Sequence, residues 1–261
     1  SGARNRIHSV GPAMKNVTGL VRGIYLDTFI DSVLIANNMI SIGFGDTNDV
    51  RYDGIYDASM AGALRVFVGY NSVSIGGTSM GIAGSSGINH TGMSPIRLRN
   101  NAFSNLRGGG GGFHQTLVNG TPSWFPGSSD NNVLYNLNSA QLTGWLGGPM
   151  NLATWVSTTL GDFQSVNADP KFVNPPAGDL HIDSTVYSPA DNAGTSLLTV
   201  ADDFDSQFRA PAPDIGADEY TIASPGSFTL LQPADDAANQ PVSGTLTWAP
   251  SAAAGSYDLY L

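Results

Sequence analysis

Apolar and polar residues alternate in short segments along the first half of the chain, and each segment ends at an asparagine. The alternating apolar pairs of the first three segments are Val33 and Ile35, Val66 and Val68, and Ile96 and Leu98. A further apolar residue follows each asparagine by two positions, as Ile40, Val73 and Phe103. A period of two is typical of a strand with one buried face. We therefore predict a strand, a corner at the asparagine and a second strand in every segment.

The asparagines themselves recur at nearly constant spacing. Asn38, Asn71, Asn101 and Asn132 are separated by 33, 30 and 31 residues, which is the period of one turn in a solenoid. Asparagine suits a corner because it tolerates left-handed backbone angles and forms local hydrogen bonds. Stacked turns would also place the four amides above one another, and we predict a structural ladder in which each amide satisfies the next.

An antiparallel sandwich is the alternative interpretation of the same pattern, with the asparagines in ordinary hairpin turns. The turns of a sandwich usually recur every 8–12 residues or so. The longer period here favours the solenoid.

Composition supports an all-β fold and restricts the partners. The 32 glycines and 15 prolines leave little room for helix, and only residues 153–160 and 196–203 could form short helical turns. The chain has no cysteine, a net charge of −10 and two lysines, Lys15 and Lys171. Such a surface could not neutralise a row of phosphates, so we expect no nucleic-acid partner. No apolar run approaches the 18 or so residues that span a membrane.

The second half of the chain carries motifs with a family resemblance. The strings are Ala168–Phe172, Gly178–Ile182, Ser188–Gly194 and Pro213–Tyr220. Together with the asparagine segments they resemble bacterial secreted proteins of the pectate-lyase-like superfamily, whose fold is a right-handed parallel β-helix. The resemblance implies such a β-helix over residues 1–223, with a C-terminal capping segment from about residue 168, and an extracellular or bacterial cell-surface location. Because the chain begins with Ser1, we expect a mature or truncated segment of a longer protein.

Residues 224–261 have a different pattern. Three short alternating segments are similar to the opening strands of a fibronectin type III domain: residues 228–233, 244–248 and 256–261. Such a β-sandwich domain needs about seven strands and roughly 100 residues. We therefore predict an incomplete fibronectin type III-like domain here.

No assembled catalytic set is evident in the repeat region. A lyase of this fold would need carboxylates for calcium and a basic residue to remove a proton, whereas a hydrolase would need two carboxylates beside the glycosidic bond. The weak catalytic candidates are Asp27, Asp31 and Arg97. We expect most charged residues of the repeats to lie on a solvated wall.

Two further features are candidates for binding. Trp124, Phe125 and Trp145 stand among turn-forming residues and could stack on sugar faces, or could simply pack beneath a long loop. Before them, the five glycines 108–112 predict a flexible excursion from the wall. In the last part of the β-helix, Asp202, Asp203 and Asp205 could supply oxygen ligands to calcium, although such acidic groups also serve simply to solubilise an end.

Two functions of different classes remain open. The first is a non-enzymatic extracellular β-helix module, such as a stalk, an adhesin or a protein that binds a polysaccharide or a host or cell-surface glycan. The second is a polysaccharide lyase or glycoside hydrolase that acts in a groove along the β-helix. Residues 6–26 resemble a turn with an open edge, so homo-assembly end to end through strand edges is also predicted. No cofactor other than calcium is expected.

Overall fold

The computed structural model describes residues 2–10, 18–27, 31–60, 65–122, 124–221, 229–233, 237–239 and 243–249. It is an all-β structure in which parallel strands stack into a β-solenoid. The chain divides into two compact units, one of residues 1–183 and 187–220 and one of residues 184–186 and 221–261. The solenoid predicted from the asparagine spacing is confirmed.

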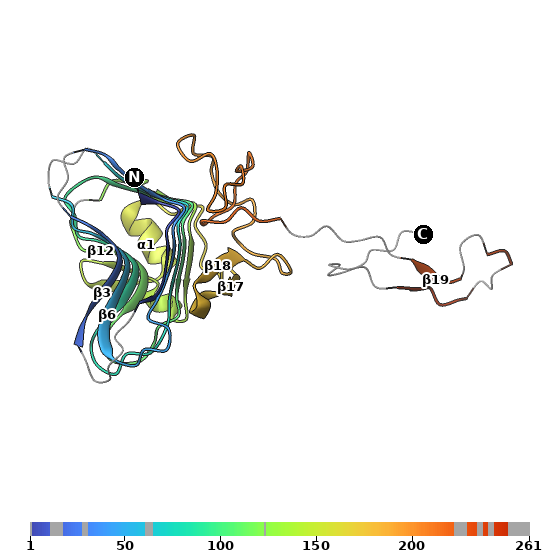
Figure 1. Ribbon diagram of the computed structural model, residues 1–261, viewed down its shortest axis with the longest axis horizontal. Coiled ribbons are helices and arrows are strands. Elements are labelled where there is room, and N and C mark those ends of the chain that lie inside the picture. Colours follow the sequence, from blue (N-terminus) through green and yellow to red (C-terminus); the bar gives the residue numbers. More distant parts are fainter. Residues whose placement is uncertain are drawn as a thin grey trace. The chain divides into compact units, whose positions relative to one another are not determined.

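Every turn of the solenoid contributes one strand to each of three sheets. The first sheet has the order β1 (Gly2–Ala3), β4 (Val33–Ala36), β7 (Val66–Gly69), β10 (Ile96–Arg99) and β13 (Ser129–Asp130). The second has the order β2 (Arg6–Val10), β5 (Met39–Ile42), β8 (Ser72–Ile75), β11 (Ala102–Asn105) and β14 (Val133–Asn136). The third contains β3 (Thr18–Leu26), β6 (Asp49–Asp57), β9 (Ser85–His90), β12 (His114–Asn119), β15 (Thr143–Trp145) and β16 (Gly148–Met150). Figure 1 shows β3, β6 and β12 in the curved third sheet.

In-register pairing produces the hydrophobic core. Ile40, Val73, Phe103 and Leu134 occupy equivalent positions of successive turns, and all four are fully buried. Their neighbours along the strands point to the opposite face of the sheet. The core is therefore a stack of like residues, which is why one hydrophobic pattern recurs in every turn.

The asparagine ladder is confirmed, although the left-handed residue lies one position earlier than expected. Positive φ angles of 52°, 55°, 57° and 53° occur at Asn37, Tyr70, Asn100 and Asn131, and not at the ladder asparagines. Nδ2 of Asn38 donates to Oδ1 of Asn71 at 2.8 Å, and the same bond continues to Asn101 and Asn132. The residue before each ladder asparagine makes the corner. The asparagine side chain turns inward and hydrogen-bonds the backbone of that corner.

The end of the core beyond the last full turn is closed by residues 143–166. β16 pairs antiparallel with β15, and α1 (Leu152–Thr159) places the fully buried Trp155 in the main core cluster. The helix begins where Asn151 accepts a hydrogen bond from the Thr154 amide and ends at the left-handed Leu160. The helix predicted at 153–160 is confirmed, whereas residues 196–203 form no helix.

The segment expected to form the cap, from about residue 168, lies along the side of the solenoid instead. Outward-facing residues of the second sheet stand in one column: Met39, Ser72, Ala102 and Val133. β17 (Phe172–Asn174), β18 (Asp179–Ile182) and residues 190–217 cover this column, and Figure 1 shows β17 and β18 beside the wall of strands. The prediction of a cap at this position is therefore corrected. An apolar outer column needs a lateral cover, which a pattern that tracks only the inward face does not reveal.

The second unit contains one described pair of strands. β19 (Leu230–Gln232) and β20 (Thr247–Trp248) pair antiparallel, with Leu230 opposite Trp248. They coincide with the first two strands predicted for this region. The third, at 256–261, lies outside the described residues, so the fibronectin type III-like domain stays a prediction. No helix among the described residues is long and apolar enough to cross a membrane.

Candidate functional site

The three catalytic candidates do not form one group. Asp27 directly follows β3, and Asp31 precedes β4 and accepts a hydrogen bond from the Ser32 amide. Arg97, on β10, aligns with Phe67 and then with Leu34. It thus stands two strands from the turn that carries Asp31, or about 10 Å in the direction of the stack. Their catalytic role stays a prediction.

Arg97 and Phe125 instead meet in a small pocket at the corner between the third and first sheets. We call this the corner pocket. Its volume is about 120 Å³, and it is lined by Arg65, Pro95, Ile96, Arg97 and residues 125–128. Two of the sequence candidates, one named for catalysis and one for sugar binding, thus lie in one place.

Exposed charge and an exposed ring define the chemistry of the corner pocket. The Phe125 side chain is 59% exposed, and Arg65 and Arg97 are exposed. Neither guanidinium group forms a hydrogen bond or an ion pair with any residue that the structure describes, and the described lining contains no carboxylate. The pocket is therefore locally cationic on a protein whose net charge is −10.

The nearby Arg99, unlike Arg65 and Arg97, is hydrogen-bonded within the protein. It donates to the carbonyl oxygens of Leu98, at 2.8 Å, and Gly127, at 2.6 Å. Burial lowers the pKa of its guanidinium, Asp130 acts in the opposite direction, and Arg97 lowers it further. Arg99 therefore fixes the 125–128 corner, while Arg65 and Arg97 remain available to a ligand.

The two other aromatic candidates pack inward. Trp124 lies in T-shaped contact with Trp145, at 6.3 Å between ring centroids, and with the buried Trp155, at 5.3 Å. Both Trp124 and Trp145 are partly buried against the main core. This arrangement fits the alternative of packing beneath a loop, and Phe125 is the member of the predicted trio with an exposed ring.

Several charged groups of the repeats are buried, where we expected a solvated wall. Asp57 and His90 form a pair of 2.6 Å between Oδ2 and Nδ1, and both side chains are at most 2% exposed. Burial alone would raise the pKa of Asp57, but the hydrogen bond and charge of His90, together with hydrogen bonds from Ser59, hold it below its usual value. Asp53 is also fully buried and accepts a hydrogen bond of 2.5 Å from the Ser86 hydroxyl. The parallel register stacks these side chains, so pairs 33 residues apart in sequence satisfy one another.

The glycine run forms the second pocket, of about 360 Å³, which we call the glycine pocket. It is lined by residues 107–114, Asn136, Leu137, Asn138 and Gln141. The run follows the preceding turn closely, since the Gly111 amide donates to the Gly81 carbonyl at 2.7 Å. The expected flexible excursion is therefore a segment packed on the preceding turn, and glycine is required at Gly109, Gly110 and Gly112, where an added Cβ would overlap that turn.

His114 lines the glycine pocket and is hydrogen-bonded to the backbone of the run. Nε2 of His114 lies 3.0 Å from the Gly109 carbonyl oxygen, which can only accept, so this nitrogen carries the proton. Burial lowers the pKa of His114, a hydrogen bond to Gly109 opposes the shift, and Arg107 reinforces it. His114 therefore positions the loop as an uncharged group.

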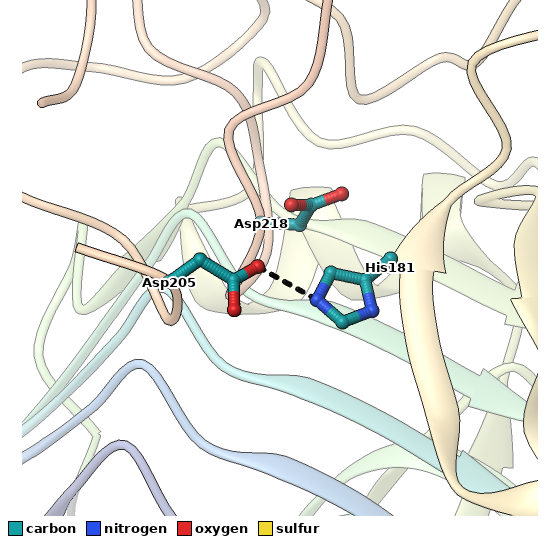
Figure 2. A group of neighbouring side chains, drawn as sticks. All are labelled: His181, Asp205 and Asp218. Carbon is teal, nitrogen blue, oxygen red and sulfur yellow. Dashed lines mark hydrogen bonds and ion pairs between the residues drawn. The ribbon is translucent and has the colours of Figure 1, made fainter. Parts of the chain in front are cut away.

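A third cluster lies in the segment that covers the second sheet, shown in Figure 2. His181 on β18 has Nε2 at 2.8 Å from Oδ2 of Asp205 and Nδ1 at 2.5 Å from Oδ1 of Asp179. Asp218 completes the group, and one ligand atom from each of His181, Asp205 and Asp218 lies within 4.8 Å of the others. Burial and the charges of Asp203 and Asp205 raise the pKa of Asp218, against the opposing effects of the Ile182 amide and His181.

The structure separates the three residues predicted to bind calcium. Asp202 forms an ion pair with Arg4. Asp203 is fully buried and accepts hydrogen bonds from the backbone amides of Asp205, Gln207 and Glu219. Of the three, Asp205 alone belongs to a group of side chains that could hold a metal ion. Calcium binding at the predicted trio stays a prediction.

Sequence reasoning grouped Asp218 with Asp205 among the acidic residues, but it missed His181, which 24 residues of mostly irregular chain separate from Asp205. The Asp179-Leu180-His181 string was the available signal, since alternation on a strand places Asp179 and His181 on one face.

Comparison with known proteins adds no relative. No protein-family model, no curated protein and no solved structure matches the chain.

Proposed function

We propose that this protein is a non-enzymatic, extracellular β-solenoid module that binds an acidic glycan, a sugar chain with carboxylate or sulfate groups, at the corner pocket. The observation that carries the proposal is the exposed Phe125 ring beside two guanidinium groups, Arg65 and Arg97, that the described protein leaves unpaired. The extracellular location rests on the sequence resemblance alone.

Each part of the corner pocket suits one part of such a ligand. A phenyl ring offers an apolar face to the C–H face of a pyranose, and an Arg fork binds a carboxylate or sulfate with two parallel hydrogen bonds. Arg keeps its charge at any physiological pH. Ring and charge together select a sugar that carries an anion, in preference to a neutral sugar or a free anion.

The net charge of −10 does not oppose this choice at short range. Exposed charges are screened beyond about 8 Å at physiological ionic strength, and no carboxylate belongs to the described lining. The two guanidinium groups therefore dominate the potential that a bound anion would experience. The overall charge would slow the approach of a polyanion, mainly at low salt.

The alternative, a glycoside hydrolase or polysaccharide lyase, is less well supported at this position. Hydrolysis uses two carboxylates about 5–10 Å apart across the scissile bond, and the described lining of the corner pocket offers none. A rigid wall with a shallow cationic pocket is better suited to holding a chain than to cleaving it.

Binding of three polysaccharides to the whole chain by isothermal titration calorimetry tests the proposal. Polygalacturonate and chondroitin sulfate carry the anions, and dextran is the neutral comparison. We expect the acidic chains to bind and dextran to bind at least tenfold more weakly. Arg97→Gln should weaken binding about ten- to a hundredfold, because a charge-assisted hydrogen bond contributes roughly 1.5–3 kcal/mol. Phe125→Ala should weaken it about tenfold.

Two matched variants control for charge and for apolar surface. Lys171→Gln removes one exposed positive charge outside the pocket, and Phe208→Ala removes a ring that is 86% exposed. Equal losses in Arg97→Gln and Lys171→Gln would mean that binding follows overall charge, and would overturn the proposal. An unsaturated-product and reducing-end assay on the same mixtures would reveal cleavage, in which case the enzyme alternative replaces it.

A further inference from the structure

Three segments that are distant in sequence bring ligand atoms together on the covered side of the solenoid. His181 comes from β18, Asp205 from the turn after residue 202, and Asp218 from the last stretch of the unit. Figure 2 shows the imidazole facing the Asp205 carboxylate, with the Asp218 side chain beside this pair. The ligand atoms lie within 4.8 Å of one another, which is a spacing that one cation can span.

Two carboxylates fix the orientation of the His181 ring, and a metal on Nε2 would replace the proton that this nitrogen shares with Asp205, which is released to solvent. Oδ1 of Asp179 holds Nδ1 at 2.5 Å, so Nε2 faces Asp205. A histidine that binds a metal through one nitrogen almost always donates its other N–H to a carboxylate or a carbonyl, which fixes the tautomer and raises the basicity of the ligand. Asp179 has this supporting position.

Asp218 supplies a second, independent indication. Asp218 is 5% exposed, and its Oδ2 accepts a hydrogen bond of 2.8 Å from the Ile182 amide. Its other oxygen forms no hydrogen bond with any residue that the structure describes. This second oxygen is not one of the fully buried, unpartnered side-chain atoms of the described residues, so it is accessible to an ion.

The donor set selects the cation. Calcium prefers six to eight oxygen ligands, whereas one imidazole nitrogen with carboxylates suits zinc and related transition metals. We propose that His181, Asp205 and Asp218 bind a Zn²⁺ ion, with His181 held by Asp179 and a fourth position left to water. The site would join three chain segments over the second sheet, and it does not depend on the proposed glycan binding.

Bound zinc should stabilise the fold, because an ion that binds only the folded state raises its stability. The whole chain is freed of metal with EDTA, dialysed, and titrated with ZnCl₂ or CaCl₂ by calorimetry. Native mass spectrometry gives the stoichiometry and thermal unfolding gives Tm. We expect one zinc ion per chain, a rise in Tm, and binding of Ca²⁺ at least tenfold weaker.

Asp205→Asn is the main variant, because its side chain is 43% exposed and its described side-chain bond is to His181. Asp169→Asn removes an equally exposed carboxylate that pairs with Lys171 and serves as the control. The affinity for Zn²⁺ should fall at least tenfold in Asp205→Asn and in His181→Gln, and stay unchanged in Asp169→Asn. Circular dichroism of the metal-free variants checks that they fold.

Three results would overturn the proposal. One is folded wild-type protein that binds no zinc, and a second is tighter binding of calcium than of zinc. The third is zinc binding that Asp205→Asn and His181→Gln leave unchanged, which would place the ion at another histidine such as His8. Should one variant fail to fold, the other still decides the outcome.

Discussion

Nδ2 of Asn132 donates a hydrogen bond of 3.2 Å to Oδ1 of Asp162, so the ladder of buried amides ends on a carboxylate. The same carboxylate accepts from Trp155 Nε1 at 2.8 Å and from the Ser165 hydroxyl at 2.6 Å. Each ladder amide donates toward this end, and an anion is the strongest acceptor that can terminate such a chain. Asp162 therefore connects the repeat to the helix that closes the core.

Replacing Asp162 by alanine should destabilise the solenoid severely. The change leaves buried donors of Trp155, Ser165 and Asn132 without their shared acceptor, and hydrogen bonds to a charged group each contribute roughly 1.5–3 kcal/mol. We expect a loss of at least about 3 kcal/mol in the free energy of unfolding, measured by urea denaturation. Asp169→Ala, at an exposed carboxylate, should change it by less than about 0.5 kcal/mol. Similar small losses in both variants would show that the ladder end contributes little.

An interruption in the middle of the ladder should also be costly. Asn71 accepts from Asn38 and donates to Asn101 through a side chain that is fully buried. Asn71→Ala would leave partners on both sides unsatisfied, for an expected loss of about 2–4 kcal/mol in the same urea experiment. Asn167→Ala, at an exposed asparagine outside the ladder, is the control and should be nearly neutral. Loss of cooperativity with Asn71→Ala would indicate that the turns on either side unfold separately.

The sequence predicted the parts of the structure that depend on the inward face of each strand, because only that face has a regular hydrophobic pattern. The inward column of Ile40, Val73 and Phe103 repeats with a fixed period, so the turns and the ladder followed directly from the pattern. The outward column of Met39 and Ser72 mixes apolar and polar residues, so its cover could not be predicted. A period-two pattern reports burial on one face only.

The candidate sites were predicted less well, because their residues converge through loops. Phe125 and Arg97 were both selected from the sequence, but their meeting in one pocket depends on the close stacking of corners. His181 and Asp218 join Asp205 through irregular chain, whose path no periodicity fixes.

Asp214 should make stability depend on pH between about 4 and 6. Burial raises its pKa to about 6, with Glu219 and Asp191 adding to the effect and the amides of Asn192 and Tyr220 opposing it. The folded state thus keeps a proton that the unfolded state releases near pH 4, so stability decreases as the pH rises through this window. Two pKa units correspond to on the order of 2–3 kcal/mol.

The contribution of Asp214 is isolated by comparison with a variant that cannot titrate. Between pH 4 and pH 6.5, the unfolding free energy of the wild type should fall by this amount relative to that of Asp214→Asn. Asp169→Asn, at the exposed carboxylate, should leave the slope of the wild type unchanged. A constant difference between wild type and Asp214→Asn would assign the pH dependence to other groups.

The glycine run offers a comparison between two neighbours of different geometry. Gly110 has φ +63°, and a Cβ added there would overlap the Gly81 carbonyl oxygen, whereas a Cβ on Gly108 would meet nothing within 4 Å. Gly110→Ala should therefore destabilise the protein by more than about 1–2 kcal/mol, the cost of a left-handed alanine alone. Gly108→Ala should be neutral or slightly stabilising, because it restricts only the unfolded chain.

Amide hydrogen exchange distinguishes a local effect from a global one in these glycine variants. The Gly111 amide donates to Gly81 at 2.7 Å, so Gly110→Ala should speed exchange at Gly111, while amides of the core strands respond only to the lower global stability. Gly108→Ala should leave exchange at Gly111 unchanged. If both alanine variants were tolerated equally, the run would be a free loop after all, and the glycine pocket would have no fixed wall.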